Sequence, residues 1–439
     1  MLCFFMAAPL PPPDDFPFCV NNFPDCEGAS ATATRFLPKA FTRMSKRKTL
    51  FRRVNDWLHL WLGLTSGIIV VIIALTGCIY AFQEEISDLT QPYRFVKAEN
   101  RPFLPPSAMR QAAALLAGEN PVLGVTYGHT GRSAITAYMD KEDGYTLIYM
   151  NPYTGAILKE KALKHDFFRF ILEGHFNLWL PRPIGQPIVA TATLIFILLL
   201  ISGLIMWWPK RWNRANRNKS FKVKTGGSAK RLNYDLHNVL GFYAMTIALV
   251  LGITGLVWGF QWFSKSYFYT VTGGRTFKEW KAPLSDTTAI AAMQLPEDKI
   301  WAQVRHLNGS IDIDFANKTA DPIRVTYNPE KGTYYKREFW FYDRYTLKKI
   351  PGGGFYGKPY EATSKGEKLY RMNYDIHVGA IAGLPGKILM FCISLICASL
   401  PVTGFIIWWG RKKKQAKKKK TTFRRPQPAA VQEAEPALP

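Results

Sequence analysis

Residues 55–83 read NDWLHLWLGLTSGIIVVIIALTGCIYAFQ, and residues 233–261 read NYDLHNVLGFYAMTIALVLGITGLVWGFQ. When the two stretches are aligned on His59 and His237, they share residues at matching offsets, most of them polar or glycine: Asn55/Asn233, Leu58/Leu236, Gly63/Gly241, Thr76/Thr254, Gly77/Gly255, Phe82/Phe260 and Gln83/Gln261. Apolar bias alone would match mainly Leu, Ile and Val. These identities therefore indicate a duplicated unit with a specific task.

Both stretches are long enough to cross a bilayer, whose hydrocarbon core of about 30 Å requires about 20 helical residues. The apolar runs 57–82 and 239–263 meet this length, and so do 188–208 and 388–409. The last two runs also resemble each other, because each has a glycine near its start, a Ser/Thr-Gly pair and a Trp pair: Gly185, Ser202-Gly203 and Trp207-Trp208 in one, Gly386, Thr403-Gly404 and Trp408-Trp409 in the other. We predict a membrane α-helical protein with four transmembrane helices in a tandem helix–domain–helix repeat.

Lys and Arg are concentrated beside the predicted spans. Residues 43–53 contain six, residues 209–231 contain nine and residues 411–425 contain ten, with no Asp or Glu in any of them. Together they match the net charge of +25. The positive-inside rule then predicts cytoplasmic termini and two extracytoplasmic loops. It also indicates that the charge faces anionic lipid headgroups, so we expect the bilayer and not a nucleic acid as the partner.

These signals divide the chain into successive segments. We expect a disordered or over-extended N-terminal segment over 1–43, with Met44 a natural start, and a disordered tail over 410–439. The predicted helical parts are 44–83 with its basic flank, 186–208, 234–263 and 377–409, and 209–233 is a basic link. Residues 84–185 and 264–376 are predicted to form two small α+β extracytoplasmic domains. Each combines short alternating strands with a helix, over 107–117 in the first and near 287–293 in the second.

Four of the seven histidines stand at span entrances. His59 and His237 enter the first and third spans, and His175 and His377 precede the second and fourth. The segment Arg231–His237 (RLNYDLH) nearly recurs as Arg371–His377 (RMNYDIH) at the opposite face. Two imidazoles on facing helices are the axial ligands of a b-type haem. We therefore predict two haem b groups with these four histidines as ligands to iron, and read His129, His165 and His306 as ordinary residues.

Small residues are predicted to complete each haem site. Gly203 and Gly404 should share the level of His59 and His237, and Gly77 and Gly255 the level of His175 and His377, so that a macrocycle can approach the backbone. An asparagine stands four residues before three of the histidines, at Asn55, Asn233 and Asn373. These asparagines are expected either to orient the ligands or to cap helices. The simpler alternative is that the histidines are structural and the glycines pack helices.

The chain also resembles a known family. The residues that carry the resemblance are Leu58-His59, Thr76-Gly77, His175, Ser202-Gly203, His237, His377, Thr403-Gly404 and the strand-turn Asn151-Pro-Tyr-Thr-Gly155, and they are similar to the bacterial PepSY-associated transmembrane family over about 46–411. The second external turn, Asp343–Leu347, lacks the glycine that follows Thr154. The resemblance implies two haems, periplasmic PepSY domains, and reduction of ferric siderophores at the inner membrane.

The sequence thus predicts a multi-pass dihaem oxidoreductase of the bacterial inner membrane that passes electrons to a periplasmic ferric chelate, such as a ferric siderophore. The chain has no Rossmann or flavin motif, so the electron donor would be a separate quinol or cytoplasmic flavoprotein. One alternative is a haem-free PepSY-type membrane protein that binds or regulates a periplasmic peptide or protease. A transporter is disfavoured because 63–82, 188–208, 241–260 and 388–409 contain no Asp, Glu, Lys or Arg.

Overall fold

A computed structural model describes residues 49–277, 282–288 and 294–423. The predicted N-terminal segment 1–43, most of the helix predicted near 287–293 and the end of the tail lie outside the described residues. Within the described part, four helical segments are long and apolar enough to cross a membrane: Leu50–Ala81, Arg182–Trp207, Ala229–Gly259 and Ala380–Ala416. They correspond to the four predicted spans.

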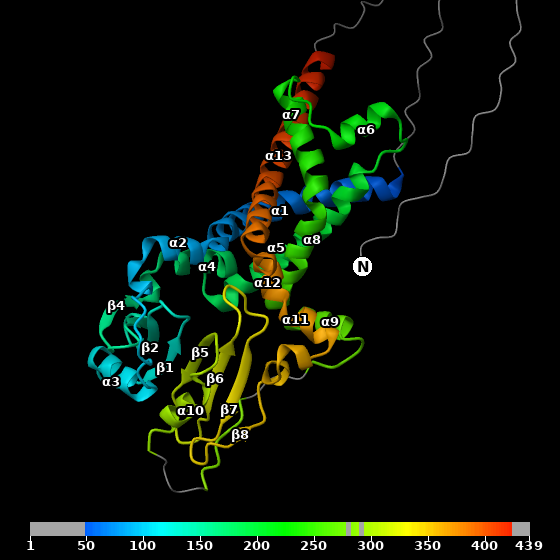
Figure 1. The fold of residues 1–439 in the computed structure, drawn as a ribbon. Coiled ribbons are helices and arrows are strands. Elements are labelled where there is room, and N and C mark those ends of the chain that lie inside the picture. The colour runs from blue at the N-terminus through cyan, green and yellow to red at the C-terminus, as the bar shows by residue number, and fades with distance from the viewer. Residues whose placement is uncertain (1–48, 278–281, 289–293, 424–439) are drawn as a thin grey trace, which may run out of the picture. The chain divides into compact units, whose positions relative to one another are not determined.

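Two of these segments are single helices and two are composite (Figure 1). The first two are α1 (Leu50–Ala81) and α5 (Arg182–Trp207). The third consists of α7 (Ala229–Asp235), a π-helical turn (Leu236–Leu240) and α8 (Gly241–Gly259). The fourth consists of a 3-10 turn (Ala380–Ala382) and α13 (Gly383–Phe423). In α5, Pro183 lies in the first turn, where a backbone N–H would have no acceptor within the helix, so proline costs no hydrogen bond there.

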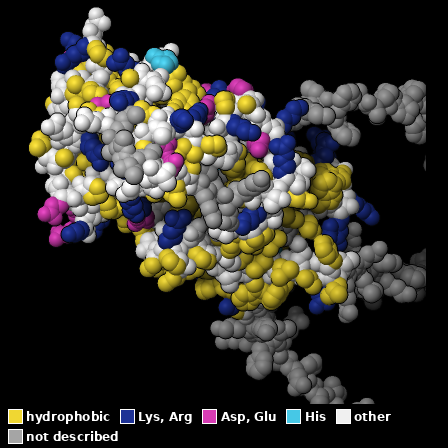
Figure 2. Space-filling model, turned by 90° about the horizontal axis from the view of Figure 1, so that it is seen from below, with side chains coloured by type: hydrophobic (Ala, Val, Ile, Leu, Met, Phe, Trp, Pro, Cys, Tyr) yellow, Lys and Arg dark blue, Asp and Glu magenta, His cyan; other side chains and the backbone are white. Residues whose placement is uncertain are grey.

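The helices pack through small residues. α1 and α8 each contact both α5 and α13. A methyl group on Gly67 would lie 3.1 Å from Cβ of Pro401, and one on Gly252 would lie 2.8 Å from Ile197. Glycine therefore allows these helices to approach closely, as is usual between membrane helices. Large apolar side chains on the outside of the spans, such as Ile68 and Phe405, are exposed. In Figure 2, hydrophobic side chains gather in the lower part of the view, as expected of a surface that contacts lipid.

Shorter helices flank the spans. They are α2 (Gln83–Thr90), α3 (Pro106–Ala117), α4 (Phe167–Asn177), α6 (Arg214–Phe221), α9 (Gln261–Val271), α10 (Pro296–Val304), α11 (Lys365–Arg371) and α12 (Asn373–His377). Single 3-10 turns occur at Pro92–Arg94, Leu163–His165, Gly354–Gly357 and Tyr360–Ala362. α4 begins at the side-chain cap of Asp166, whose carboxylate accepts from the backbone N–H of Arg169 at 2.8 Å.

The strands of both large loops form one sheet, where we had predicted two separate domains. The first loop contributes β1 (Val122–Tyr127), β2 (Ala134–Asp140), β3 (Gly144–Met150) and β4 (Ile157–Ala162). The second contributes β5 (Ser310–Asp314), β6 (Ile323–Asn328), β7 (Glu338–Tyr342) and β8 (Lys349–Ile350). Every pairing is antiparallel, in the order β4-β3-β2-β1-β5-β6-β7-β8.

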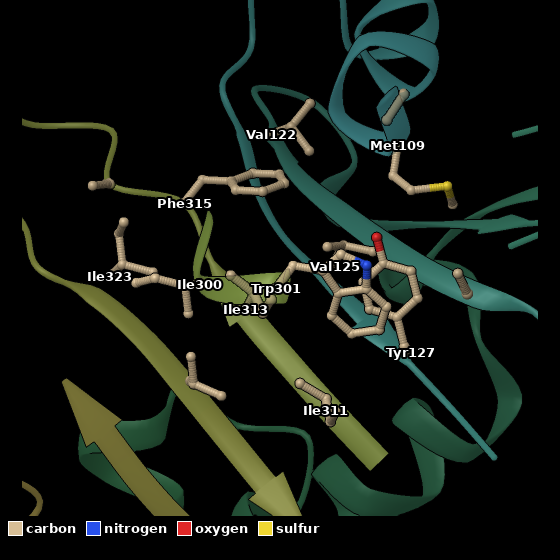
Figure 3. Packing of buried hydrophobic residues seen from close by; sticks show 14 of the residues in the cluster. Met109, Val122, Val125, Tyr127, Ile300, Trp301, Ile311, Ile313, Phe315 and Ile323 are labelled. Atoms are coloured by element: carbon tan, nitrogen blue, oxygen red, sulfur yellow. The ribbon is translucent and has the colours of Figure 1, made fainter. Parts of the chain in front are cut away.

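The β1–β5 pairing joins the two halves of the sheet. Val125 pairs with Ile313 in the centre of this seam, and both side chains are fully buried. α3 and α10 supply the other side of the same core, in which the rings of Tyr127 and Trp301 stack with centroids 4.1 Å apart (Figure 3). One continuous core thus replaces the two small ones that separate domains would have had.

The corresponding turns of the two halves keep the same hydrogen bonds. Asn151 Oδ1 accepts from the backbone N–H groups of Tyr153 and Thr154, at 2.8 and 3.3 Å. Asp343 Oδ1 accepts from those of Tyr345 and Thr346, at 3.0 and 2.8 Å. Gly155 then has a φ of 74°, and Leu347 holds the equivalent place with a φ of 57°. The second turn therefore keeps a left-handed backbone without its glycine, at a cost in strain.

Gly124 should be essential at the β1–β5 seam. A Cβ atom there would lie 2.7 Å from the carbonyl oxygen of Ile313. We expect Gly124→Ala to destabilise the fold by about 1–3 kcal/mol, because the seam must shift to admit the methyl group. The thermal unfolding midpoint of the purified protein should fall. Gly226→Ala is the control, since its added methyl meets open space. Equal midpoints for the two variants would contradict a tight seam.

Candidate paired-histidine site

The first two histidines meet at the end of the spans next to the link between α5 and α7, and we name His59 and His237 the link-side pair. Nδ1 of His59 on α1 lies 2.6 Å from the hydroxyl of Ser202 on α5. The neighbouring Gly203 lies against the imidazole ring, because a Cβ atom added there would be 3.4 Å from Cε1 of His59. α1 therefore presents its histidine to a Ser-Gly step on the helix opposite.

His237 repeats this arrangement with α13. It lies in the π-helical turn, a feature that often marks functional positions. Its Nδ1 is 2.9 Å from the hydroxyl of Thr403 and 3.1 Å from the carbonyl oxygen of Leu400. A Cβ on Gly404 would lie 3.2 Å from Cε1 of the ring.

The other two histidines meet at the opposite end of the spans, next to the sheet, and we name His175 and His377 the sheet-side pair. Nδ1 of His175 on α4 is 2.9 Å from the carbonyl oxygen of Ile73 and 3.3 Å from the hydroxyl of Thr76. A Cβ on Gly77 would lie 3.1 Å from Cε1 of this ring. α4 thus brings His175 to the helix bundle, ahead of Pro181 and the start of α5.

His377 is the last residue of α12 and faces α8. Its Nδ1 lies 2.9 Å from the hydroxyl of Thr254. A Cβ on Gly255 would lie 3.3 Å from Cε1. The ring also packs edge-on against Trp258, with centroids 5.4 Å apart. All four histidines therefore rest on a Ser/Thr-Gly step of a neighbouring span.

The hydrogen bonds determine which ring nitrogen holds the proton. The carbonyls of Ile73 and Leu400 only accept, so Nδ1 of His175 and of His237 must donate. The hydroxyls of Ser202 and Thr254 have their own hydrogens directed to backbone carbonyls, Ser202 to Leu199 at 3.1 Å and Thr254 to Val250 at 2.7 Å. They therefore accept from Nδ1 of His59 and His377 in the neutral rings. Each Nε2 is then left with a free lone pair, the form in which imidazole binds a metal.

The free nitrogens belong to rings that approach in pairs. The ring centroids are 6.5 Å apart in the link-side pair and 6.3 Å apart in the sheet-side pair. Among the described residues, none makes a hydrogen bond to Nε2 of any of the four. An imidazole nitrogen binds a first-row metal ion at about 2 Å, so two imidazoles on opposite sides of one iron have centroids about 6 Å apart. The spacing of both pairs therefore fits bis-histidine ligation.

A cavity of about 410 Å³ adjoins the sheet-side pair. Its lining is mostly apolar and comes from α1, α4, α5, α8, α12 and α13, and it includes both histidines together with Gly77 and Gly255. Pockets for small molecules and cofactors measure about 300–1,000 Å³ and are largely apolar. The described residues contain no group of three or more His, Cys, Asp or Glu side chains that could hold a metal ion. Each histidine pair therefore offers two imidazole donors and no third ligating side chain among the described residues.

The glycines and asparagines beside the histidines make specific contacts. Each of the four glycines lies against an imidazole ring, and Gly77 and Gly255 also line the cavity. That these glycines admit the face of a macrocycle stays a prediction. Among the described residues, the amides of Asn55, Asn233 and Asn373 make no hydrogen bond to the histidines, and none of the three is the N-cap of its helix. Each donates to the backbone carbonyl of the Ser or Thr that precedes the glycine, at 3.2, 3.0 and 3.1 Å for Ser202, Thr403 and Thr254. The asparagines thus tie the helices together beside the histidines.

Sequence reasoning missed two further features. The Ser and Thr of the Ser/Thr-Gly pairs were considered only as small residues, and their hydroxyls were not predicted to be hydrogen-bond partners of the histidines. Their position next to glycine in all four steps was a usable signal. Trp207, from one of the repeated Trp pairs, is buried, stacks on Phe242 with centroids 3.7 Å apart, and donates to the carbonyl of Ser220 at 3.1 Å. His165, by contrast, is exposed and lies 3.3 Å from Asp143, away from both pairs.

Comparison with known proteins agrees with this arrangement of spans. The model of the PepSY-associated TM region matches residues 57–411, which cover most or all of each span and include all four paired histidines. The chain belongs to the PepSY-associated TM region family. No curated protein matches it. Membership of this family and the four apolar helices identify a multi-pass membrane protein.

Ser202 provides a direct test of the tautomer argument. Replacement by Ala leaves the Nδ1–H of His59 without its acceptor, which costs about 1–3 kcal/mol for a buried donor. We expect Ser202→Ala to lower the thermal unfolding midpoint. Ser202→Thr should stay near the wild type, because the second half of the chain uses Thr403 at the equivalent step. If the threonine variant is as unstable as the alanine variant, the hydroxyl is not the relevant group.

Proposed function

We propose that this protein is a dihaem oxidoreductase of the bacterial inner membrane, which passes electrons across the membrane to a periplasmic ferric chelate and so serves iron acquisition. The observation that carries the proposal is the double pairing of histidines whose Nδ1 atoms are all hydrogen-bonded and whose Nε2 atoms have no hydrogen-bond partner among the described residues. A purely structural role for a histidine would not require four such hydrogen-bonded rings, paired at two levels of the bundle. The proposed cofactor-binding residues are those of the sequence prediction.

A haem b at each level would supply a one-electron Fe³⁺/Fe²⁺ couple. The chain's own residues would bind and shield it. His59 and His237 would hold one group, and His175 and His377 the other, each oriented by a hydroxyl or carbonyl of the facing helix. Apolar side chains around the sheet-side pair, among them Phe391 and Trp258, line the cavity. They would keep water from the iron ligands.

The proposed orientation of the chain in the membrane follows from the flanking charges. The Lys/Arg clusters adjoin the link-side ends of the spans, which supports a cytoplasmic link and cytoplasmic termini under the positive-inside rule. The sheet would then lie in the periplasm, next to the pair that delivers electrons to a ferric siderophore or similar chelate. The donor would be quinol or a separate cytoplasmic flavoprotein. We further propose that the chain is a duplicated helix–domain–helix unit whose external parts are PepSY-like.

The histidines give the primary test. We expect the dithionite-reduced minus oxidised spectrum of the wild type to show low-spin b-type bands, at two haems per chain. His237→Ala and His377→Ala should each remove one haem, because each leaves one pair with a single ligand. Haem per chain is measured by a pyridine haemochrome assay with protein quantification.

His165→Ala is the matched control, since this histidine is exposed and belongs to neither pair. It should keep both haems. A wild type that shows no haem bands after expression with ample haem would exclude the oxidoreductase. The protein would then be best read as a haem-free PepSY-type membrane protein that binds a periplasmic peptide or protease.

The glycine steps allow a test of electron transfer itself. Gly255→Leu places a side chain against the ring of His377 and into the cavity. In proteoliposomes with a reductant supplied on the link side, we expect this variant to lose at least ten-fold in the rate of ferric chelate reduction, followed with a ferrous-iron indicator. Its link-side haem should remain reducible. Unchanged chelate reduction would show that the sheet-side pair is not on the electron path.

A further inference from the structure

Two nearly identical segments precede His237 and His377, yet their arginines bind different partners. In Arg231–His237, the guanidinium Nε of Arg231 donates to Asp235 Oδ2 at 2.8 Å, four residues on in the same helix. In Arg371–His377, the equivalent arginine makes no ion pair with Asp375 among the described residues. The same local sequence therefore makes different contacts at its two positions.

Arg371 binds the backbone of the external sheet region. Its guanidinium donates to four carbonyl oxygens: Nε to Tyr335 at 2.8 Å, Nη1 to Phe355 and Lys358 at 3.2 Å each, and Nη2 to Arg337 at 2.5 Å. Tyr335 and Arg337 lie in the loop between β6 and β7, and Phe355 and Lys358 lie after β8. Only 1% of Arg371 is exposed. A buried charge satisfied by backbone carbonyls holds both loops to α11.

Asp375 provides the second attachment. It is completely buried, and its Oδ1 accepts from the backbone N–H of Tyr334 at 2.9 Å. Tyr334 belongs to the same loop between β6 and β7. Its ring also packs edge-on against that of Tyr374, with centroids 5.1 Å apart. α12 is thus bound to the loop between β6 and β7.

The spans hold the other side of α12. Asn373 donates to the carbonyl oxygen of Thr254, and His377 bonds the hydroxyl of the same residue. α12 contains only five residues, so few other interactions can hold it in place. Its orientation, and with it the direction of the His377 ring, is set between α8 on one side and the two sheet loops on the other.

We propose that Arg371 is the positioning residue through which the external sheet sets the orientation of His377 in the sheet-side pair. This rests on the proposed function in one respect, because the histidine is taken as an iron ligand. Arg231 has no such role, since its partner lies in its own helix. The sheet-side pair is therefore joined to the external region, which would hold the iron chelate, and the link-side pair is not.

The test compares the redox potentials of the two haems in the full-length protein. Arg371→Gln should shift the midpoint potential of one haem and alter its low-spin EPR signal, while the other haem stays as in the wild type. Arg371→Lys keeps the charge and some of the donors, so it should shift the same haem less. The control is Arg344→Gln, because Arg344 also donates to a backbone carbonyl, that of Lys318 at 2.7 Å, on the external sheet.

A second readout does not need haem. Hydrogen–deuterium exchange of residues 372–379 should be faster in Arg371→Gln than in the wild type and unchanged in Arg344→Gln. If the wild type binds no haem, the proposed function fails and exchange alone decides the role of Arg371. Unchanged potentials in Arg371→Gln, or unchanged exchange across 372–379, would overturn the proposal. A loss of both haems together would also overturn it, because the effect would then be global.

Discussion

The hydrogen bond from each histidine Nδ1 to the helix opposite is the interaction on which the membrane part depends. A buried imidazole must place its N–H on an acceptor, and in a helix bundle the acceptors are backbone carbonyls and the hydroxyls of Ser and Thr. Reaching them brings the flat ring against the neighbouring backbone at a glycine, where an added Cβ atom would lie 3.1–3.4 Å from the ring. The Ser/Thr-Gly step and the histidine are therefore one structural unit, present four times.

These units connect elements within each half of the chain, and the histidine pairs connect the halves. His59 rests on α5 and His175 on α1, both within the first half, whereas His237 rests on α13 and His377 on α8, both within the second. The rings then meet across the halves at 6.5 and 6.3 Å. The external sheet makes a second connection, since β1 and β5 join its halves through a shared core. A bundle with two such connections can hold side chains at fixed separations on both faces of a membrane.

Much of the candidate site was accessible from the sequence, and the part that was missed has a common cause. The position of His59 near the start of one span and of Gly203 near the end of the next implies that they share a level, because antiparallel helices rise at the same rate per residue. The direction in which Asn55 points cannot be obtained this way. Its amide had several possible acceptors nearby, and it binds the carbonyl of Ser202 only because the helices pack closely enough. That the histidines bind haem is our proposal.

The sequence by itself determined the four spans and the placing of four histidines at span ends. Those features depend on local properties, namely hydrophobic length, charge and spacing along one helix. Only the tertiary structure decided that both large loops contribute strands to one sheet. It also decided that Arg371 binds the backbone carbonyls of two loops and not the carboxylate of Asp375. Thr126 and Asp312 bond across the sheet seam although they are 186 residues apart. No local pattern encodes such a partner, because the choice between equivalent carbonyls and strand edges is made by the packing of the whole chain.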